Sequence, residues 1–404
     1  MPRTIGFRIL CFLLLLLVAV QVTHAQKKIA DEPAKVLVTM PFQLLNGGVV
    51  IVQGLLPAYP DTLNFVLDTG SGGISLDSSL VAHLGLSPVP TSIKLRGVAG
   101  IKKVSFLRNQ RLNLGGLIID RLNFHINDYS FLSSIYGIRI DGIIGYSLFS
   151  RFIVKIDYDD LKLQICSNGR LEYPSGGYLL KPHIRSLVVQ DASIQDNRKI
   201  QARFLHDIGA GVSLMLSKAF VDDSAFLMEN RKLWPKRGHG LGGKIDMQLT
   251  IVKAVRFGPY RFKNVPTLIF EDQYDVTSYP YLCGLIGNDI FRRFNAIYNY
   301  AQGEIHLLPN KGFRDRFDYS YSGLDIQLIN GTIEVGGVAE KSPAAIAGIK
   351  EGDIILGINN DFSANFARYK KMLQQANKQI FLFIRRGEEL LITQIKIKNI
   401  KRKG

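Results

Sequence analysis

Two similar stretches of the chain each place one aspartate where an apolar run enters a glycine-rich turn. The first is "FVLDTGSGGISL" around Asp68, and the second, one residue shorter, is "FLHDIGAGVSL" around Asp207. Two close carboxylates cannot both ionise easily, so one of them keeps a proton at moderate pH. The ionised acid can take a proton from water while the protonated acid hydrogen-bonds a carbonyl oxygen. Such a pair suits hydrolysis of a peptide bond without a metal ion or a covalent intermediate.

An internal duplication predicts that the two aspartates meet. "DGIIGYSLFSRFIVKIDY" at 141–158 recurs as "CGLIGNDIFRRFNAIYNY" at 283–300, a constant offset in the numbering (283 − 141 = 142). The aspartates have nearly the same offset (207 − 68 = 139), and "RGVAG" at 96–100 recurs as "RGHGLGG" at 237–243 (237 − 96 = 141). The motifs occur in the same order in both copies and with nearly the same spacing. This indicates two lobes of roughly 140 residues each. An approximate two-fold axis between the lobes would bring equivalent acids together.

Other acids in the repeat do not keep this symmetry. Asp141 corresponds to Cys283 and Asp157 corresponds to Asn299, so neither has an acidic counterpart. A site that needs two symmetric acids would not lose one of them. We therefore interpret Asp141 and Asp157 as structural residues.

The elements expected around the aspartates are mainly short strands. Asn46-Gly47 between two alternating apolar segments is a strong hairpin signal. Helices are few and short, for example "DSSLVAHLG" with Asp77 or Ser78 as N-cap. A longer helix is predicted at 365–378, beyond a Lys/Arg/Asp-rich connector at 311–318. The glycines of the catalytic turns allow tight turning and close approach of the partner lobe. The hydroxyls next to Asp68 are expected to hold its carboxylate.

The paired motifs resemble those of aspartic peptidases of the pepsin and retropepsin type. Residues 68–71 and 207–210 look like two copies of the Asp-Thr/Ser-Gly-Ser/Ala signature, and 143–145 and 285–287 resemble the apolar-apolar-Gly stretch beneath each catalytic loop. The resemblance covers roughly residues 35–310. It implies a mainly β, bilobal pepsin/retropepsin-like fold in which Asp68 and Asp207 activate a water molecule. The residues that would support the pair are Thr69, Gly70, Ser71, Gly209 and Ala210. The glycines expected in flaps over the cleft are Gly97, Gly100, Gly238 and Gly240.

One position departs from the family pattern. Family members usually carry Thr or Ser after each catalytic Asp, and those hydroxyls bond across the pair. The second copy has Ile208 at this position, with His206 as an unusual polar neighbour before Asp207. This departure leaves open a catalytically inactive bilobal scaffold that binds extended peptides in its cleft.

The segment "YSGLDIQLINGTIEVGGVAEKSPAAIAGIKEGDIILGINN" at 321–360 resembles a PDZ domain. The residues that look like its carboxylate-binding loop are Ser322, Gly323, Leu324, Asp325 and Ile326. The resemblance implies that a peptide C-terminus adds to the strand after this loop, with the helix at 365–378 as the other groove wall. The alternatives are an unoccupied groove that only stabilises the lobes, and an adaptor at the cell envelope that depends on this groove and on the basic charge of the protein.

The start of the chain indicates export. Arg3 and Arg8 precede an apolar stretch that ends in Thr23-His24-Ala25, which is the pattern of a secretory signal peptide. Its removal leaves Cys166 and Cys283, which allow one disulfide at most. We expect a periplasmic or extracellular protein without a transmembrane span after cleavage. The expected divisions are a signal peptide at 1–25, lobes at 26–175 and 176–312, and a PDZ-like domain at 319–400.

Composition and the remaining motifs exclude several classes. A hydrophobic content of 47% with 21% charged residues is typical of a globular protein. The 50 basic and 34 acidic residues give a net charge of +16, but the basic residues are dispersed except in the tail, so we expect no nucleic-acid partner. No zinc motif or Gly-x-Ser-x-Gly elbow occurs in the sequence, and "GHGLGG" lacks the context of a dinucleotide site. We expect a monomer without a cofactor or metal ion that acts on peptide or protein substrates.

Overall fold

A computed structural model describes residues 32–57, 59–97, 100–240 and 243–401 of the chain. Strands dominate these residues, so the predicted mainly β fold class is confirmed. The predicted signal peptide lies outside the described residues. Within the described ranges, no helix has both the length and the apolar character needed to cross a membrane. Cys166 and Cys283 are both buried free thiols, so they do not form the one disulfide that the sequence allows.

The first lobe is built on an eight-stranded sheet with the order β2-β3-β4-β9-β5-β8-β7-β6. Its strands are β2 (Gln43–Leu44), β3 (Val50–Gly54), β4 (Leu63–Leu67), β5 (Ile74–Asp77), β6 (Val89–Gly97), β7 (Gly100–Leu114), β8 (Leu117–Asn127) and β9 (Gly142–Ile144). Its helices are α2 (Ser78–His83), α3 (Ser130–Tyr136) and α4 (Tyr146–Phe149). Asp77 is the N-cap of α2, as predicted, because its side chain accepts the backbone N–H groups of Ser79 and Leu80.

The second lobe repeats this sheet strand for strand, with the order β13-β14-β15-β20-β16-β19-β18-β17. Its strands are β13 (His183–Ile184), β14 (Val188–Gln195), β15 (Lys199–Asp207), β16 (Leu214–Ser217), β17 (Trp234–Gly240), β18 (Gly243–Phe257), β19 (Tyr260–Phe270) and β20 (Gly284–Gly287). Its helices are α5 (Lys218–Asp223) and α6 (Asn288–Phe291). The matching strand order is what a sequence duplication predicts.

A six-stranded sheet joins the lobes, with the order β1-β11-β10-β21-β22-β12. Its strands are β1 (Val36–Pro41), β10 (Ile153–Asp157), β11 (Lys162–Cys166), β12 (Tyr178–Leu180), β21 (Phe294–Asn299) and β22 (Glu304–Pro309). The lobes meet where β10 runs antiparallel to β21, and there Lys155 pairs with Ile297. The separation of these two residues in the numbering (297 − 155 = 142) equals the offset of the repeat, so the approximate two-fold axis passes between them. One continuous apolar core extends through both lobes.

The predicted hairpin at Asn46-Gly47 forms, but its turn is a short 3₁₀ segment, η1 (Asn46–Gly48), between β2 and β3. Gly47 and Gly48 both have positive φ, at 75° and 86°. The turn packs against the second lobe, where the Asn288 side chain donates to the Gly48 carbonyl. The contact between lobes therefore explains why the turn is wider than the two-residue turn that Asn-Gly usually forms.

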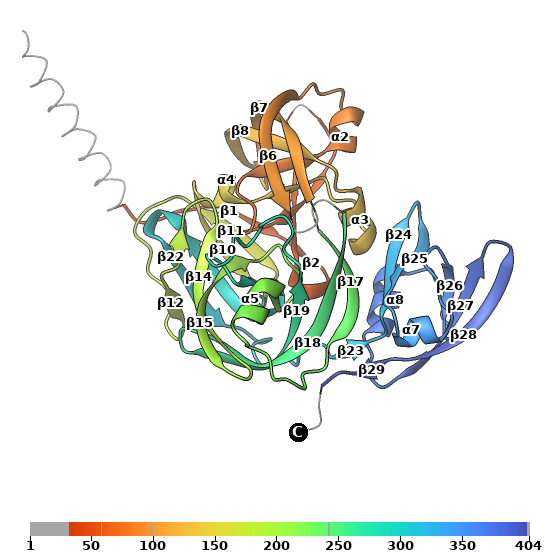
Figure 1. Cartoon of the computed structure of the whole chain (residues 1–404). Coiled ribbons are helices and arrows are strands. Elements are labelled where there is room, and N and C mark those ends of the chain that lie inside the picture. The colour runs from red at the N-terminus through yellow and green to blue at the C-terminus, as the bar shows by residue number, and fades with distance from the viewer. Residues whose placement is uncertain (1–31, 58, 98–99, 241–242, 402–404) are drawn as a thin grey trace, which may run out of the picture.

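The C-terminal domain has its own apolar core and a five-stranded sheet with the order β24-β25-β26-β27-β28. Its strands are β24 (Leu324–Ile329), β25 (Thr332–Val338), β26 (Ile354–Ile358), β27 (Gln379–Arg386) and β28 (Glu389–Lys396), and its helices are α7 (Pro343–Ile346) and α8 (Phe366–Leu373). A small ribbon of β23 (Ser320–Tyr321) and β29 (Lys398–Asn399) closes its base. Helix α8 ends earlier than predicted, at Leu373 and not at 378. Asn377 takes a left-handed conformation, and its N–H bonds the Ile397 carbonyl, so tertiary contact ends the helix. The domain lies beside the lobes, with α3 of the first lobe facing it (Figure 1).

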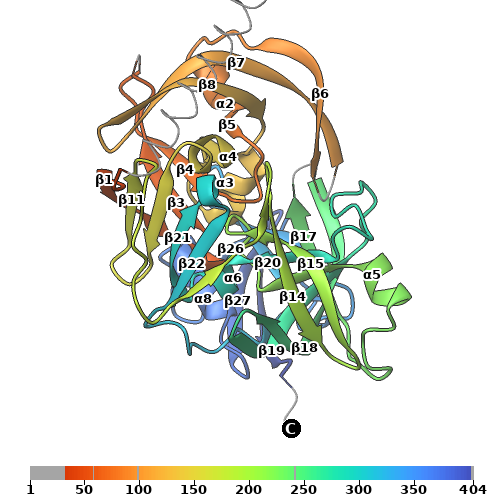
Figure 2. The same cartoon turned by 90° about the vertical axis from the view of Figure 1, so that its left-hand side faces the viewer.

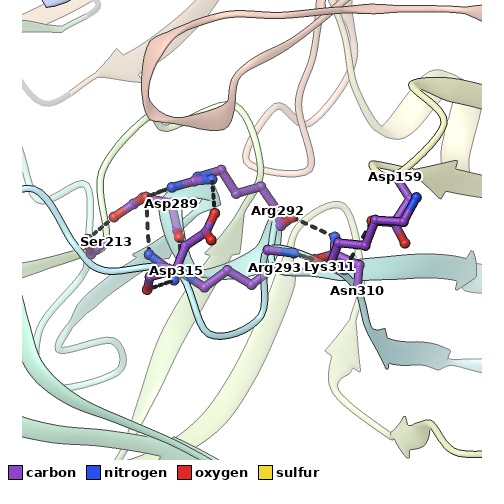
Figure 3. A network of polar contacts seen from close by, with 9 residues as sticks. Asp159, Ser213, Asp289, Arg292, Arg293, Asn310, Lys311 and Asp315 are labelled. Carbon is purple, nitrogen blue, oxygen red and sulfur yellow. Dashed lines mark hydrogen bonds and ion pairs between the residues drawn. The ribbon is translucent and has the colours of Figure 1, made fainter.

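The connector between the second lobe and the C-terminal domain is held by a polar network (Figure 3). Arg293 is fully buried, and its guanidinium donates to the backbone carbonyls of Asp289 and Asp315 while packing over the Phe317 ring. The Asp289 carboxylate accepts a bond of 2.6 Å from Ser213, a residue just after the second glycine-rich turn. The connector is therefore fixed to the lobe by buried, charge-assisted hydrogen bonds.

Candidate active site

Each of the two aspartates stands where a strand leaves its sheet. Asp68 follows β4, which runs parallel to β9, and its N–H donates to the Ile144 carbonyl at 2.9 Å. Asp207 ends β15, which runs parallel to β20 in the same way. The glycine after each apolar pair is required because the loop that carries the aspartate passes directly over it. A Cβ atom at Gly145 would lie 2.9 Å from the Asp68 carbonyl oxygen, and one at Gly287 would lie 2.7 Å from the Ala210 carbonyl oxygen.

The two carboxyl groups meet between the lobes, close enough for each to shift the pKa of the other. Each one also lies against the glycine of the opposite turn. A Cβ atom on Gly70 would be 2.6 Å from the Asp207 carboxyl carbon, and one on Gly209 would overlap the Asp68 carboxyl group. Both glycines are therefore needed for the acids to approach. Both aspartates keep part of their surface exposed, so water can reach them.

The surroundings of the two acids are unequal. Asp207 Oδ1 accepts the N–H groups of Gly209 at 2.9 Å and Ala210 at 3.0 Å, whereas Asp68 Oδ1 accepts that of Gly70 at 2.6 Å. Burial raises the pKa of Asp68 to well above the usual range, and the negative charge of Asp207 adds to the rise, while the backbone N–H groups of Gly70 and Ser71 oppose it. Burial also raises the pKa of Asp207, but the interaction with Asp68 and the two backbone donors oppose the rise. Both pKa values are therefore raised, and the pair holds one proton between its two carboxyl groups at moderate pH.

Thr69 has a different role from the one its position next to Asp68 suggests. Its hydroxyl donates to the His206 carbonyl at 2.6 Å and accepts the Ile208 N–H at 3.1 Å, so it holds the backbone of the opposite turn and not the adjacent carboxylate. This bond across the lobes is the one that the family resemblance implies. Ile208 is fully buried in the common apolar core and has no hydroxyl to make the symmetric bond. One threonine therefore holds the two turns together from one side.

His206 lies behind the second turn, inside the protein. Its side chain is fully buried, its Nε2 lies 3.1 Å from the Tyr298 hydroxyl, and its ring stacks on Phe291 with the centroids 3.5 Å apart. Burial lowers the pKa of His206 to about 3, so the imidazole is neutral at moderate pH. It supports the Asp207 loop as a neutral packing group.

The predicted flap glycines lie in two long hairpins, one in each lobe. Gly97 and Gly100 end β6 and begin β7, and Gly238 and Gly240 lie in β17, while the tips at 98–99 and 241–242 fall outside the described residues. The first hairpin arches toward β17 of the second lobe (Figure 2). An exposed ion pair at 3.1 Å joins Arg96 of this hairpin to Asp275 of the second lobe.

Two tyrosines near the pair carry no signal in the sequence. Burial raises the pKa of Tyr136, and the charges of Asp207 and Asp68 add to that rise, so the phenol lies within electrostatic reach of both acids. Burial likewise raises the pKa of Tyr300 well above its usual range, with the charge of Asp68 as the next cause. In the described part of the chain, no group of three or more His, Cys, Asp or Glu residues could hold a metal ion.

The loop expected to bind a peptide carboxylate packs against α7. Gly323 has a φ of 72°, and a Cβ atom on it would overlap the Ser342 side chain. The Ser322 hydroxyl accepts the Leu324 N–H at 3.1 Å, so that donor is engaged within the loop. Asp325 and Ile326 continue into β24, which is the edge strand of its sheet. The two walls of the expected groove are thus β24 and α8.

Comparison with known families agrees with this architecture. A family profile described as Aspartyl protease matches residues 51–148 and again residues 191–290, so each match contains one of the two aspartates. A profile described as PDZ domain matches residues 334–386, which begin after the expected carboxylate loop. A search of curated proteins found no match. The two lobes of this chain belong to the aspartyl protease family, and a PDZ domain follows them.

Proposed function

We propose that the protein is an exported aspartic endopeptidase whose PDZ domain binds the C-termini of peptides or proteins. The observation that carries this proposal is the meeting of Asp68 and Asp207 between the lobes, where each carboxyl group lies against the glycine of the opposite turn. The pair is reachable by water, and its two members have unequal surroundings. When two carboxyl groups have unequal pKa values, one can act as the acid and the other as the base.

In the proposed reaction, we assign the shared proton to Asp68 and the negative charge to Asp207. Asp207, ionised and held by two backbone N–H groups, accepts a proton from a water molecule as the water oxygen attacks the peptide carbonyl carbon. Asp68 gives its proton to the carbonyl oxygen, and a tetrahedral diol forms. Collapse of the diol returns one proton to Asp68, transfers the proton on Asp207 to the leaving nitrogen, and breaks the carbon–nitrogen bond. The substrate backbone would lie extended in the cleft beneath the two hairpins.

Export is the part of the proposal that depends on the sequence alone. The charged and apolar segments within residues 1–25 support a signal peptide with cleavage after Ala25. The test is the intact mass and N-terminal sequence of the protein recovered from the producing cells. A mature protein that begins at Gln26 supports export, and an uncleaved N-terminus contradicts it.

Cleavage is tested by incubating the purified protein with a diverse peptide pool from acidic to neutral pH. Asp68→Asn and Asp207→Asn are each expected to lower the rate by about 10²- to 10⁴-fold, because each removes one half of the acid–base pair. Asp120→Asn is the matched control, since Asp120 is exposed and pairs only with Arg111 on the surface. The pH profile should be bell-shaped, with both limbs above those of unperturbed carboxyl groups. Undiminished cleavage by Asp207→Asn would contradict the proposal.

A peptide-binding scaffold without catalysis is the second candidate, and Ile208 is the residue that favours it. Ile208 removes the hydroxyl of the second turn, yet Thr69 still bonds the backbone on both sides of Asp207. The geometry of the pair therefore does not depend on a hydroxyl at position 208. Binding of the peptide pool without cleavage at any pH would favour the scaffold.

A further inference from the structure

Helix α3 of the first lobe lies against the groove of the PDZ domain. It packs along β24, the edge strand to which a peptide would add. Its C-terminal end contacts the other groove wall, where the Lys370 ammonium of α8 donates to the Ile135 carbonyl. Gly137, which caps α3 with a φ of 71°, lies so close to Phe366 of α8 that a Cβ atom would overlap the ring. Both walls of the groove are therefore covered by one short segment of the protein itself.

The PDZ domain is anchored to the other lobe. The Tyr321 hydroxyl donates to the Pro235 carbonyl at 2.7 Å, and the rings of Tyr321 and Trp234 are 5.0 Å apart. Tyr321 and Ile400 also join an apolar cluster formed by β18 and β19. Glu351 forms ion pairs with Arg237 and Lys244 of the second hairpin. Because its base is fixed to the second lobe, the domain forms a bridge to the first lobe through α3.

The environment of Lys370 indicates which chemical group could take the place of α3. Its ammonium is half-buried, and burial lowers its pKa, while the negative charge of Asp325 opposes this change. The Ile135 carbonyl that it bonds carries only a partial negative charge. The C-terminal carboxylate of a peptide carries a full negative charge and would bond this ammonium more strongly. An extended peptide would also pair with the backbone of β24 along its edge, which a helix cannot do.

We propose that α3 is a built-in occupant of the PDZ groove, and that a peptide with a free C-terminal carboxylate competes with it for β24 and Lys370. This inference rests on the proposed peptide-binding role of the PDZ domain and not on the proposed cleavage. The intact protein binds such a peptide only in the fraction of molecules from which α3 has been released, so its apparent affinity is reduced by that fraction.

The far side of α3 connects the groove to the cleft. Tyr136, the last residue of the helix, packs in an apolar cluster with Val66 of β4 and Ile143 of β9. These are the strands that carry Asp68 and support its loop. A ligand that releases α3 therefore alters the support of one half of the catalytic pair.

The test measures binding of labelled decapeptides that end in an apolar residue with a free carboxylate; the same peptides with a C-terminal amide are the control. All proteins carry Asp68→Asn so that the probe is not cut. Gly137→Asn tolerates the left-handed backbone but overlaps Phe366, so it should release α3 and bind the probe about tenfold more tightly. Gly85→Asn is the matched control, because Gly85 has a φ of 64° and no neighbour within 4 Å of a Cβ atom. Its affinity should equal that of the parent.

Hydrogen exchange of the parent gives a second readout that needs no change to α3. Probe binding should speed exchange of the amides at 133–137, whereas the amidated probe should not. If Gly137→Asn fails to fold, Lys370→Met replaces it and should speed exchange of the same amides without any peptide. The proposed competition would be overturned if the parent and Gly137→Asn bound the probe with equal affinity and if probe binding did not change exchange of the amides at 133–137. Absence of binding to every folded variant would overturn the peptide-binding role as well, while the cleavage assay would stay unaffected.

Discussion

The buried His206 should make the protein lose stability as the pH falls below neutral. An imidazole in the unfolded chain has a pKa near 6.5, whereas burial lowers the pKa of His206 to about 3 in the folded protein. Between these values the unfolded state binds a proton that the folded state excludes, so the free energy of unfolding decreases as the pH falls. Each pH unit costs about 1.4 kcal/mol, which gives a loss of about 3 kcal/mol between pH 6.5 and about pH 4. That is a large part of the roughly 5–15 kcal/mol by which domains are usually stable.

Other groups titrate over the same range, so the effect must be isolated with a variant. Burial lowers the pKa of His125 to about 4, which adds a loss of the same sign. The raised pKa of Asp68 has the opposite effect, because the folded state then binds the extra proton and gains stability as the pH falls. The comparison of the parent with His206→Gln cancels both contributions, and glutamine can still bond the Tyr298 hydroxyl.

The assay is urea unfolding followed by circular dichroism at several pH values between about 4 and 7.5. The stability advantage of the parent over His206→Gln should shrink by about 3 kcal/mol from the upper to the lower pH. The matched control is His83→Gln, which makes the same substitution at an exposed position on α2. A pH-independent difference for His206→Gln would refute the reasoning, because the imidazole would then not be excluded from protonation by folding.

Two further changes test how the lobes and the connector are held. Thr69→Val should lower the free energy of unfolding by about 2–5 kcal/mol, because the His206 carbonyl and the Ile208 N–H lose their buried partner, whereas Thr69→Ser keeps it. Equal unfolding midpoints for the two variants would contradict this role of the hydroxyl. Arg293→Leu should release the connector and speed trypsin cleavage within 311–316, since breaking a buried charged network costs about 3–5 kcal/mol. A digestion rate equal to that of the parent would show that the connector is held by other contacts.

The sequence was sufficient where local patterns repeat. The constant offset between the two copies predicted two equivalent lobes, and the structure shows the same offset between Lys155 and Ile297 where the lobes meet. The glycines at 70, 145, 209 and 287 fit the close approach between turns and strands that the structure shows. Such a duplication can be predicted because each copy must form the same tight turn beside a parallel strand.

The sequence was insufficient where residues far apart in the chain determine the outcome. Nothing in "SFLSSIYG" indicates that α3 packs on a domain far along the chain, because its apolar residues would suit any buried face. Thr69 was expected to hold the adjacent carboxylate, yet the nearest backbone acceptor belongs to the other lobe. The helix at 365–378 was predicted too long because the contact of Asn377 with Ile397 outweighs the helical preference of the residues before it.

The bond of Thr69 to the opposite turn has a consequence for how the sequences of the two lobes diverge in evolution. In an assembly of two identical chains, every substitution appears twice, so a lost hydroxyl would disappear from both turns together. In one duplicated chain, each half accumulates its own substitutions. Retention of Thr69 on one side thus leaves position 208 free to become an apolar core residue. The two turns can therefore remain joined while their sequences, and with them the surroundings of Asp68 and Asp207, become different.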